Sequence, residues 1–193
     1  PVGAFVSDSL SEIPEKSRKL LESNIKDEDN HDLALGYIAN AIGVDDEAEA
    51  EALRLRDAWI AHPDHTILKA LVIERAIFFV ILPFFRFNGD AGLRTVSADI
   101  SRDEQIHVAT NSLVCEELGL KPSQSLDKLR RATINWIMQP LSANADKYLD
   151  KKFWLDASDR LMYEGKAPQL TETKAARMPA FFEHANTNLP QYS

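Results

Sequence analysis

The chain has 193 residues, of which 45% are hydrophobic, and a formal net charge of -8. This length and apolar content suffice for one globular domain with a sizeable core, predicted to span residues 1–193. The acidic balance disfavours sequence-independent binding to nucleic acid or to an anionic membrane. Cys115 is the single cysteine, which excludes an intrachain disulfide and favours a cytoplasmic protein.

Apolar residues recur at spacings of three and four along nearly the whole chain, which contains only seven glycines. This pattern predicts an all-α domain. The expected helices span residues 10–23, 23–43, 45–61, 65–88, 90–119, 124–149 and 150–164. From about residue 165 the chain is expected to be irregular until a short helix in AFFEHANTNL, residues 180–189.

The most apolar segment, ALVIERAIFFVILPFFRF at residues 70–87, is interrupted by Glu74, Arg75, Pro83 and Arg86. It is too short and too charged for a membrane span, so it predicts a buried helix. Just before it, the sequence HPDH predicts a turn with Asp64 as the helix N-cap. The two histidines of this turn are therefore not expected to bind metal.

Two predicted helices carry a Glu-x-x-His motif: Glu28 with His31 in KDEDNHDLALGYIA, and Glu104 with His107 in RDEQIHVATNSL. At this spacing the two side chains lie within about 60° of each other on one helix face, so each pair can bind one cation. One such pair arises often by chance. Two pairs in a chain with only five histidines are much harder to obtain by chance, and they indicate a bundle with pseudo-symmetry.

Glu74 lies between the two motifs in the chain, next to Ile73 and near Ile77 and Phe78. An isolated ionised carboxylate in such surroundings is costly to bury without a metal ion or a partner. The order Glu-x-x-His, single Glu, Glu-x-x-His is used by carboxylate-bridged two-metal sites in helical bundles. The mixed oxygen and nitrogen donors suit iron or manganese better than zinc. The sequence thus predicts a pair of metal ions, Fe/Fe or Mn/Fe.

The segments ISRDEQIHVATNSLV and, after Glu74, AIFFVILPFF resemble the ligand helices of the small, radical-generating subunit of class I ribonucleotide reductase. The resemblance implies a ferritin-like helical bundle with additional helices, in which O2 is activated at a di-metal site. The implied ligands are Glu28, His31, Glu74, Glu104 and His107. It also implies that Asp103 hydrogen-bonds a ligand histidine and connects the metals to the radical-transfer route. The implied partners are a second copy in a homodimer and a large catalytic reductase subunit.

The chain departs from this family at two places. The family carries an Asp or Glu about thirty residues before the first Glu-x-x-His, and that position would precede Pro1. The printed chain is therefore predicted to lack an N-terminal ligand helix. Where the family often has a radical-bearing Tyr, four residues after the first-motif histidine, this chain has Leu35. A tyrosyl radical is not expected at Leu35, so the oxidising equivalent would reside on the metals or elsewhere.

Two other hypotheses stay open. DEDNHDLAL and IERAIFF are also similar to the ligand helices of acyl-carrier-protein desaturases and related di-iron N-oxygenases, which oxidise a substrate bound in the same protein. In that case four phenylalanines would form a ring that keeps water from the metals: Phe78, Phe79, Phe84 and Phe85. The remaining hypothesis is a metal-poor bundle that serves only as an interaction scaffold.

Overall fold

The computed structural model describes residues 2–170, except the side chain of Lys16. Within this range every regular element is helical, apart from an isolated bridge between Ser142 and Asp150, so the all-α prediction is confirmed. The elements are α1 (Val2–Ser9), η1 (Leu10–Glu12), α2 (Glu15–Ile42), α3 (Asp46–Ala61), α4 (Thr66–Ile73), η2 (Glu74–Phe78), α5 (Phe79–Asn88), α6 (Ala91–Glu117), α7 (Gln124–Ile137) and α8 (Lys151–Glu164). The helix predicted at 180–189 lies outside the described residues.

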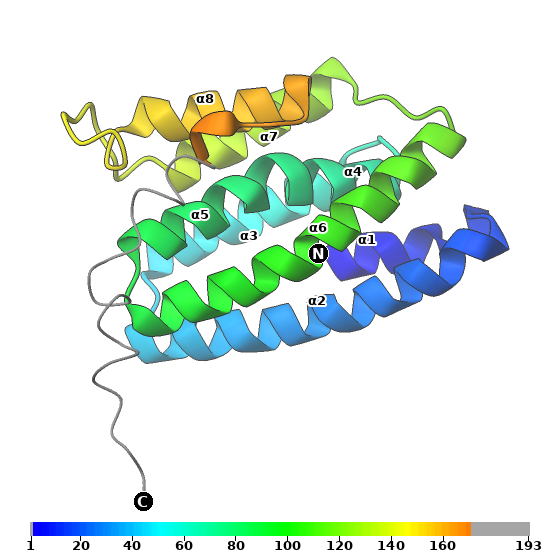
Figure 1. Ribbon diagram of the computed structural model, residues 1–193, viewed down its shortest axis with the longest axis horizontal. Coiled ribbons are helices and arrows are strands. Elements are labelled where there is room, and N and C mark those ends of the chain that lie inside the picture. Colours follow the sequence, from blue (N-terminus) through cyan, green and yellow to red (C-terminus); the bar gives the residue numbers. More distant parts are fainter. Residues whose placement is uncertain (1, 171–193) are drawn as a thin grey trace, which may run out of the picture.

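The two long helices α2 and α6 lie side by side and run in opposite directions (Figure 1). The continuous rod α4–η2–α5 packs against α6, and the short α1 packs against both α2 and α4. On the other side of this rod, α7 and α8 cover η2, and α3 contacts α7. The site-bearing helices α2, η2 and α6 therefore meet in the middle of the molecule.

Several predicted helix limits are wrong. A single helix, α2, replaces the two predicted at 10–23 and 23–43, and it begins after Pro14, which serves as its N-cap. The helix expected at 124–149 ends at Ile137, close to Pro140, since proline cannot continue a helix. His65 rather than Asp64 caps α4: its Nδ1 accepts the Ile67 amide proton.

The short helix α1 was not predicted. An isolated helix of eight residues is unstable in water. In the fold it buries Val2, Phe5 and Val6 in the first core cluster, with residues of α2 and α4. Tertiary packing rather than local propensity therefore accounts for α1.

The four phenylalanines that were predicted to form a ring do not all lie in one core. Phe78 packs against the first core cluster, whereas Phe79 and Phe84 pack against the second, which contains Trp154. Phe84 meets the Trp154 ring edge-on, with 5.4 Å between ring centroids. The predicted single ring around the metals is therefore split between two cores.

A fully buried arginine ties the outer layer to the rod. The Arg130 guanidinium donates to Asp127 and Asp159 and, over 2.6 Å, to the hydroxyl of Ser158. Ser158 in turn donates to the backbone carbonyl of Ala76, within the π-helical segment η2, over 2.6 Å. Because a π-helical turn disrupts the regular i to i-4 pattern, this outside donor helps to satisfy its backbone.

None of the helices in the described part of the chain is long and apolar enough to cross a membrane.

Replacing Ser158 with Ala is expected to lower the free energy of unfolding by about 1–3 kcal/mol, because a buried carbonyl and a buried guanidinium each lose a partner. Urea denaturation followed by circular dichroism measures the change. Ser142→Ala, in an exposed loop, is the matched control and should leave stability unchanged. Equal midpoints for the two variants would contradict this account of η2.

Candidate metal centre

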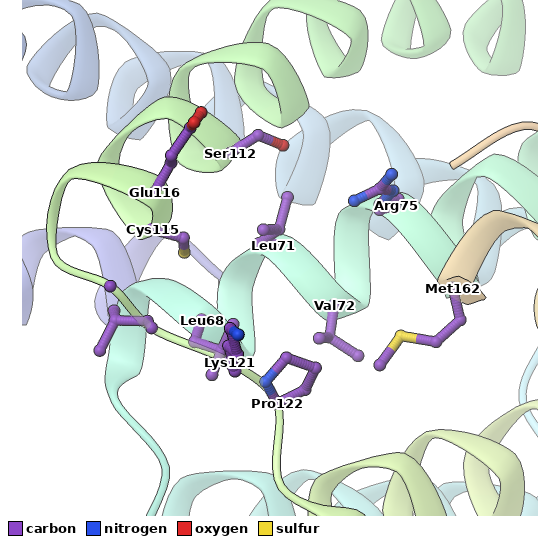
Figure 2. Close-up of a pocket in the computed structure, with 12 residues that line it drawn as sticks. Leu68, Leu71, Val72, Arg75, Ser112, Cys115, Glu116, Lys121, Pro122 and Met162 are labelled. Atoms are coloured by element: carbon purple, nitrogen blue, oxygen red, sulfur yellow. The ribbon is translucent and has the colours of Figure 1, made fainter. Parts of the chain in front are cut away.

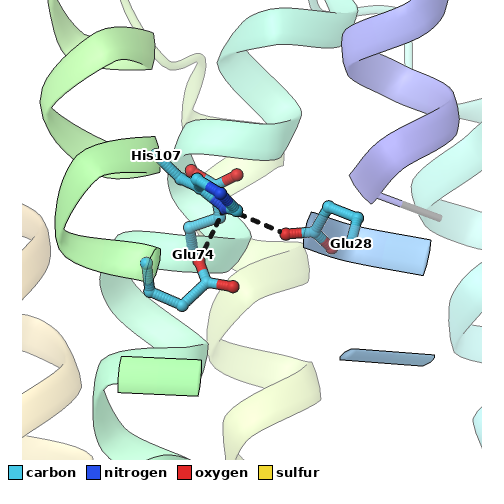
Figure 3. Close-up of side chains that lie close together, drawn as sticks. Glu28, Glu74 and His107 are labelled. Carbon is cyan, nitrogen blue, oxygen red and sulfur yellow. Dashed lines mark hydrogen bonds and ion pairs between the residues drawn. The ribbon is translucent and has the colours of Figure 1, made fainter. Parts of the chain in front are cut away.

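Four buried side chains from three segments converge between α2, η2 and α6. Glu28 comes from α2, Glu74 from the first residue of η2, and Glu104 and His107 from α6. One potential ligand atom from each lies within 4.8 Å of all the others. Figure 3 shows His107 facing Glu28, with Glu74 reaching the same space from a separate helix. We call these four residues the carboxylate cluster; they could hold a metal ion.

His31 adjoins the carboxylate cluster without belonging to its tightest group. Its Nδ1 lies 3.3 Å from a Glu104 oxygen and 3.8 Å from a Glu28 oxygen. Its ring centroid is 5.8 Å from that of His107. The structure thus brings all five predicted ligands together, with the two histidines side by side and each next to two carboxylates.

Each motif also supplies an aspartate to the histidine of the other motif. Asp103, just before Glu104, lies 3.0 Å from Nε2 of His31, as predicted. Asp27, just before Glu28, lies 3.3 Å from Nε2 of His107. Each aspartate accepts a hydrogen bond from Nε2, so Nδ1 of each ring is directed at the cluster, 3.3 Å from Glu104 for His31 and 3.2 Å from Glu28 for His107. Loss of the Nδ1 proton would make this nitrogen available to a cation.

Asp27 was missed in the sequence analysis, although a signal was present. Both motifs read Asp-Glu-x-x-His, Asp27 to His31 and Asp103 to His107. The repeated aspartate indicated a repeated role. Its partner could not be named, because the contact joins two antiparallel helices.

Several buried polar atoms of the cluster and of the adjoining His31 make no hydrogen bond of good geometry within residues 2–170. They are Nδ1 of His31, Oε1 of Glu74, and both carboxylate oxygens of Glu104. Buried polar atoms are normally paired. Here these atoms are of the types that bind iron or manganese, and two of them, Nδ1 of His31 and an oxygen of Glu104, lie 3.3 Å apart. The residues present therefore fit a bound cation.

The remaining oxygen of Glu74 is held in place by α6. Asn111, one turn beyond His107, donates its side-chain amide to Oε2 of Glu74 over 2.7 Å. At the other end, Gly3 lets α1 approach α2 closely, since a Cβ at Gly3 would lie only 3.2 Å from Cβ of Glu28. The carboxylates are thus fixed from more than one direction.

Protons take the place of a cation when none is bound. Burial, followed by the charge of Glu104, raises the pKa of Glu74 well above its ordinary value. Burial also raises the pKa of Glu104. For His31, burial lowers the pKa, but Glu104, Asp103 and Glu28 outweigh it and raise the pKa to about 9. A metal ion bound here would displace these protons.

A cleft of about 390 Å³ lies near Glu74, next to Arg75 of the rod, although none of the five predicted ligands lines it. Its apolar wall comes from α4, the loop after α6, and α8 (Figure 2): Leu68, Leu71, Val72, Leu120, Pro122 and Met162. Arg75, adjacent to Glu74 in the chain, and Cys115 of α6 also line it. Burial, then the charge of Glu74, raises the pKa of the Cys115 thiol to about 12, so this thiol is neutral.

The remaining polar candidates lie elsewhere. His65 caps α4 and its Nε2 lies 2.8 Å from Glu12, while His62 contacts Ser125, in agreement with the predicted turn. Tyr37 is 67% exposed, and Leu35 occupies the position of the family's radical tyrosine. Trp154 is fully buried in the second core cluster.

Comparison of the chain with family models, curated proteins and solved structures gives no match.

Replacing Asp27 with Asn is expected to weaken metal binding about 10–100-fold, because His107 loses the carboxylate that fixes its tautomer and orientation. Asp29→Asn removes the same charge from an exposed position of α2 and should have little effect. Calorimetric titration with Mn(II) or Co(II), in competition with a chelator, measures both. Equal losses would show that only net charge matters.

The metal-free protein is expected to lose stability between about pH 6.5 and pH 9. The pKa of His31 is about 9 in the fold against 6.5 ordinarily, so its stabilising contribution is complete below 6.5 and is lost as the pH rises through 9. The raised pKa values of Glu74 and Glu104 act in the same direction. Urea denaturation with chelator at both pH values tests this. His31→Asn should flatten the dependence, and an unchanged slope would contradict it.

Proposed function

We propose that this protein activates O2 at a pair of metal ions, Fe/Fe or Mn/Fe, in the manner of the small subunit of class I ribonucleotide reductase. The observation that carries the proposal is the buried cluster of Glu28, Glu74, Glu104 and His107, whose potential ligand atoms all lie within 4.8 Å of one another. The proposed ligands are Glu28, His31, Glu74, Glu104 and His107. When bound, such ions would supply electrons to O2 and store the resulting oxidising equivalent.

The protein's own residues prepare the site for this role. Asp103 and Asp27 accept hydrogen bonds from Nε2 of the two histidines, so that both Nδ1 atoms are directed toward the proposed metal site. The buried setting excludes water: Glu104 and His107 are both completely buried. Exclusion of water protects a strong oxidant from side reactions.

Asp103 supports the export of the oxidising equivalent. It contacts buried His31, yet its own side chain is 45% exposed. His31 and Asp103 together therefore form a hydrogen-bonded path from the cluster to the surface. A large catalytic subunit docked over Asp103 would receive the oxidising equivalent there, and we propose such a subunit and a homodimer as partners.

The proposed site stores no tyrosyl radical. Besides exposed Tyr37, the described tyrosines are Tyr148, which stacks with Phe87 in the second core, and Tyr163, which hydrogen-bonds Asp127. With Leu35 in place of the family's tyrosine, the oxidising equivalent stays on the metals.

The cleft beside Glu74 favours a second candidate function, oxidation of an apolar substrate within this protein, as in desaturases and N-oxygenases. Its aliphatic wall and its neutral thiol suit an uncharged substrate portion. The two functions differ in where the oxidising equivalent goes: out through Asp103, or into a molecule held beside Glu74.

Reconstitution with Fe(II), or with Fe(II) and Mn(II), followed by exposure to O2 tests the proposal. We expect about two metal ions per chain and a metal-centred electron paramagnetic resonance signal without a tyrosyl radical. Substoichiometric metal and no oxidised signal would favour the metal-poor scaffold.

Asp103→Asn separates the two functions. With a large reductase subunit present, it should retain metal oxidation but lose most nucleotide reduction, because the path to the surface is broken. Asp99→Asn, at an exposed position one turn earlier on α6, is the control. If wild-type protein forms the oxidised centre yet supports no nucleotide reduction, oxidation of a substrate in the cleft becomes the leading function.

A further inference from the structure

A second cleft lies on the outer side of the two helices that carry Glu74 and Glu104. It has a volume of about 280 Å³ and is bounded by α5, α6 and the segment that follows α8. Its apolar wall comprises Phe79, Pro83, Phe87, Leu161, Ala167 and Leu170. Four of these six residues are buried, namely Phe87, Leu161, Ala167 and Leu170, so the wall is part of the second core cluster.

The charged residues that line this cleft are all cationic. Arg86 of α5 and Lys166, just after α8, are its charged members, and no carboxylate among residues 2–170 contributes to the lining. Within residues 2–170, neither of the two side chains makes a hydrogen bond or an ion pair. In the cleft beside Glu74, by contrast, the cations Arg75 and Lys121 are accompanied by Glu116.

Arg86 is in an unfavourable position without an anion. Its side chain is half-buried, and burial, followed by the charge of Arg102, lowers its pKa from the ordinary value. Arg102 is itself paired with Asp99 over 2.9 Å, so that carboxylate is already engaged. A guanidinium in partly apolar surroundings gains most from a bidentate anionic partner, since it cannot lose its charge at ordinary pH.

We propose that this cleft binds a small carboxylate with an apolar body, such as a medium-chain or aryl-substituted carboxylic acid. Arg86 receives the carboxylate, Lys166 adds positive charge, and the body lies against Phe79, Phe87 and Leu161. The proposal is independent of the metal centre, because it uses none of the metal ligands.

The size and lining of the cleft favour a small carboxylate with an apolar body over other anions. At about 280 Å³ it is at the small end of ligand cavities, which run from about 300 to 1,000 Å³. A nucleotide would be too large, and its phosphates would call for more donors than one guanidinium and one ammonium. The apolar wall favours a hydrocarbon or aromatic body over inorganic phosphate.

Octanoate is the probe for the test, with two matched controls that each lack one half of it. Acetate has the charge without the body, and octanamide has the body without the charge. Saturation-transfer nuclear magnetic resonance and calorimetric titration on the full chain measure binding. We expect octanoate to bind and both controls to bind at least about 10-fold more weakly, the equivalent of about 1.4 kcal/mol.

Three variants locate the binding. Arg86→Gln should weaken octanoate binding at least about 10-fold, whereas Arg56→Gln, an exposed arginine on α3, removes the same charge and should leave it unchanged. Ala167→Leu keeps both cations but fills the cleft, and should also abolish binding. Circular dichroism verifies that each variant is folded. No binding to wild-type protein, or equal binding by Arg86→Gln and Arg56→Gln, would overturn the proposal.

Discussion

The structure depends on one constraint: three carboxylates and two imidazoles are held away from water at the centre of the molecule. An ionised group buried alone is costly, so each must be matched by a proton, a hydrogen-bond donor or a cation. The fold supplies part of the match, through Asn111 for Glu74 and two aspartates for the histidines. Glu104 has the two histidines at 3.3 Å and 3.7 Å, and one oxygen of Glu74 makes no hydrogen bond within the described chain. The convergence of these buried carboxylates and imidazoles, which hold protons when no cation is bound, is what makes the cluster a candidate metal centre.

The reciprocal contact between α2 and α6 joins the fold to the site. The helices are antiparallel, so the aspartate before one glutamate lies level with the histidine of the other motif. The pairs His31 with Asp103 and His107 with Asp27 therefore depend on a single helix register. A shift of one residue would move both aspartates by about 1.5 Å along the axis and 100° around it. The same register brings Glu28 and Glu104 together, so stable packing and ligand geometry are selected jointly.

The third ligand segment is stabilised from the opposite side. Glu74 opens the π-helical segment η2, whose Ala76 carbonyl accepts a hydrogen bond from Ser158 of α8. Buried Arg130 of α7 joins this network. The outer helices thus support a backbone irregularity at Glu74, a candidate ligand, and such irregularities often accompany functional sites. The two clefts flank the same rod, one beside Glu74 and the other beyond Phe79, which gives the two proposed ligand sites separate surroundings.

The sequence by itself determined the helical class and singled out five candidate ligand residues, because apolar spacing predicts helices and an i, i+3 pair shares one face. The cost of burying Glu74 likewise followed from its apolar neighbours. Only the tertiary structure decided the partner of Asp27, since that contact joins residues 80 positions apart in the chain. It also decided the existence of α1, the π-helical turn at Glu74 and the position of Arg86, which has no partner among residues 2–170. These features arise from packing between segments that are distant in the chain, and a local sequence pattern cannot predict such packing.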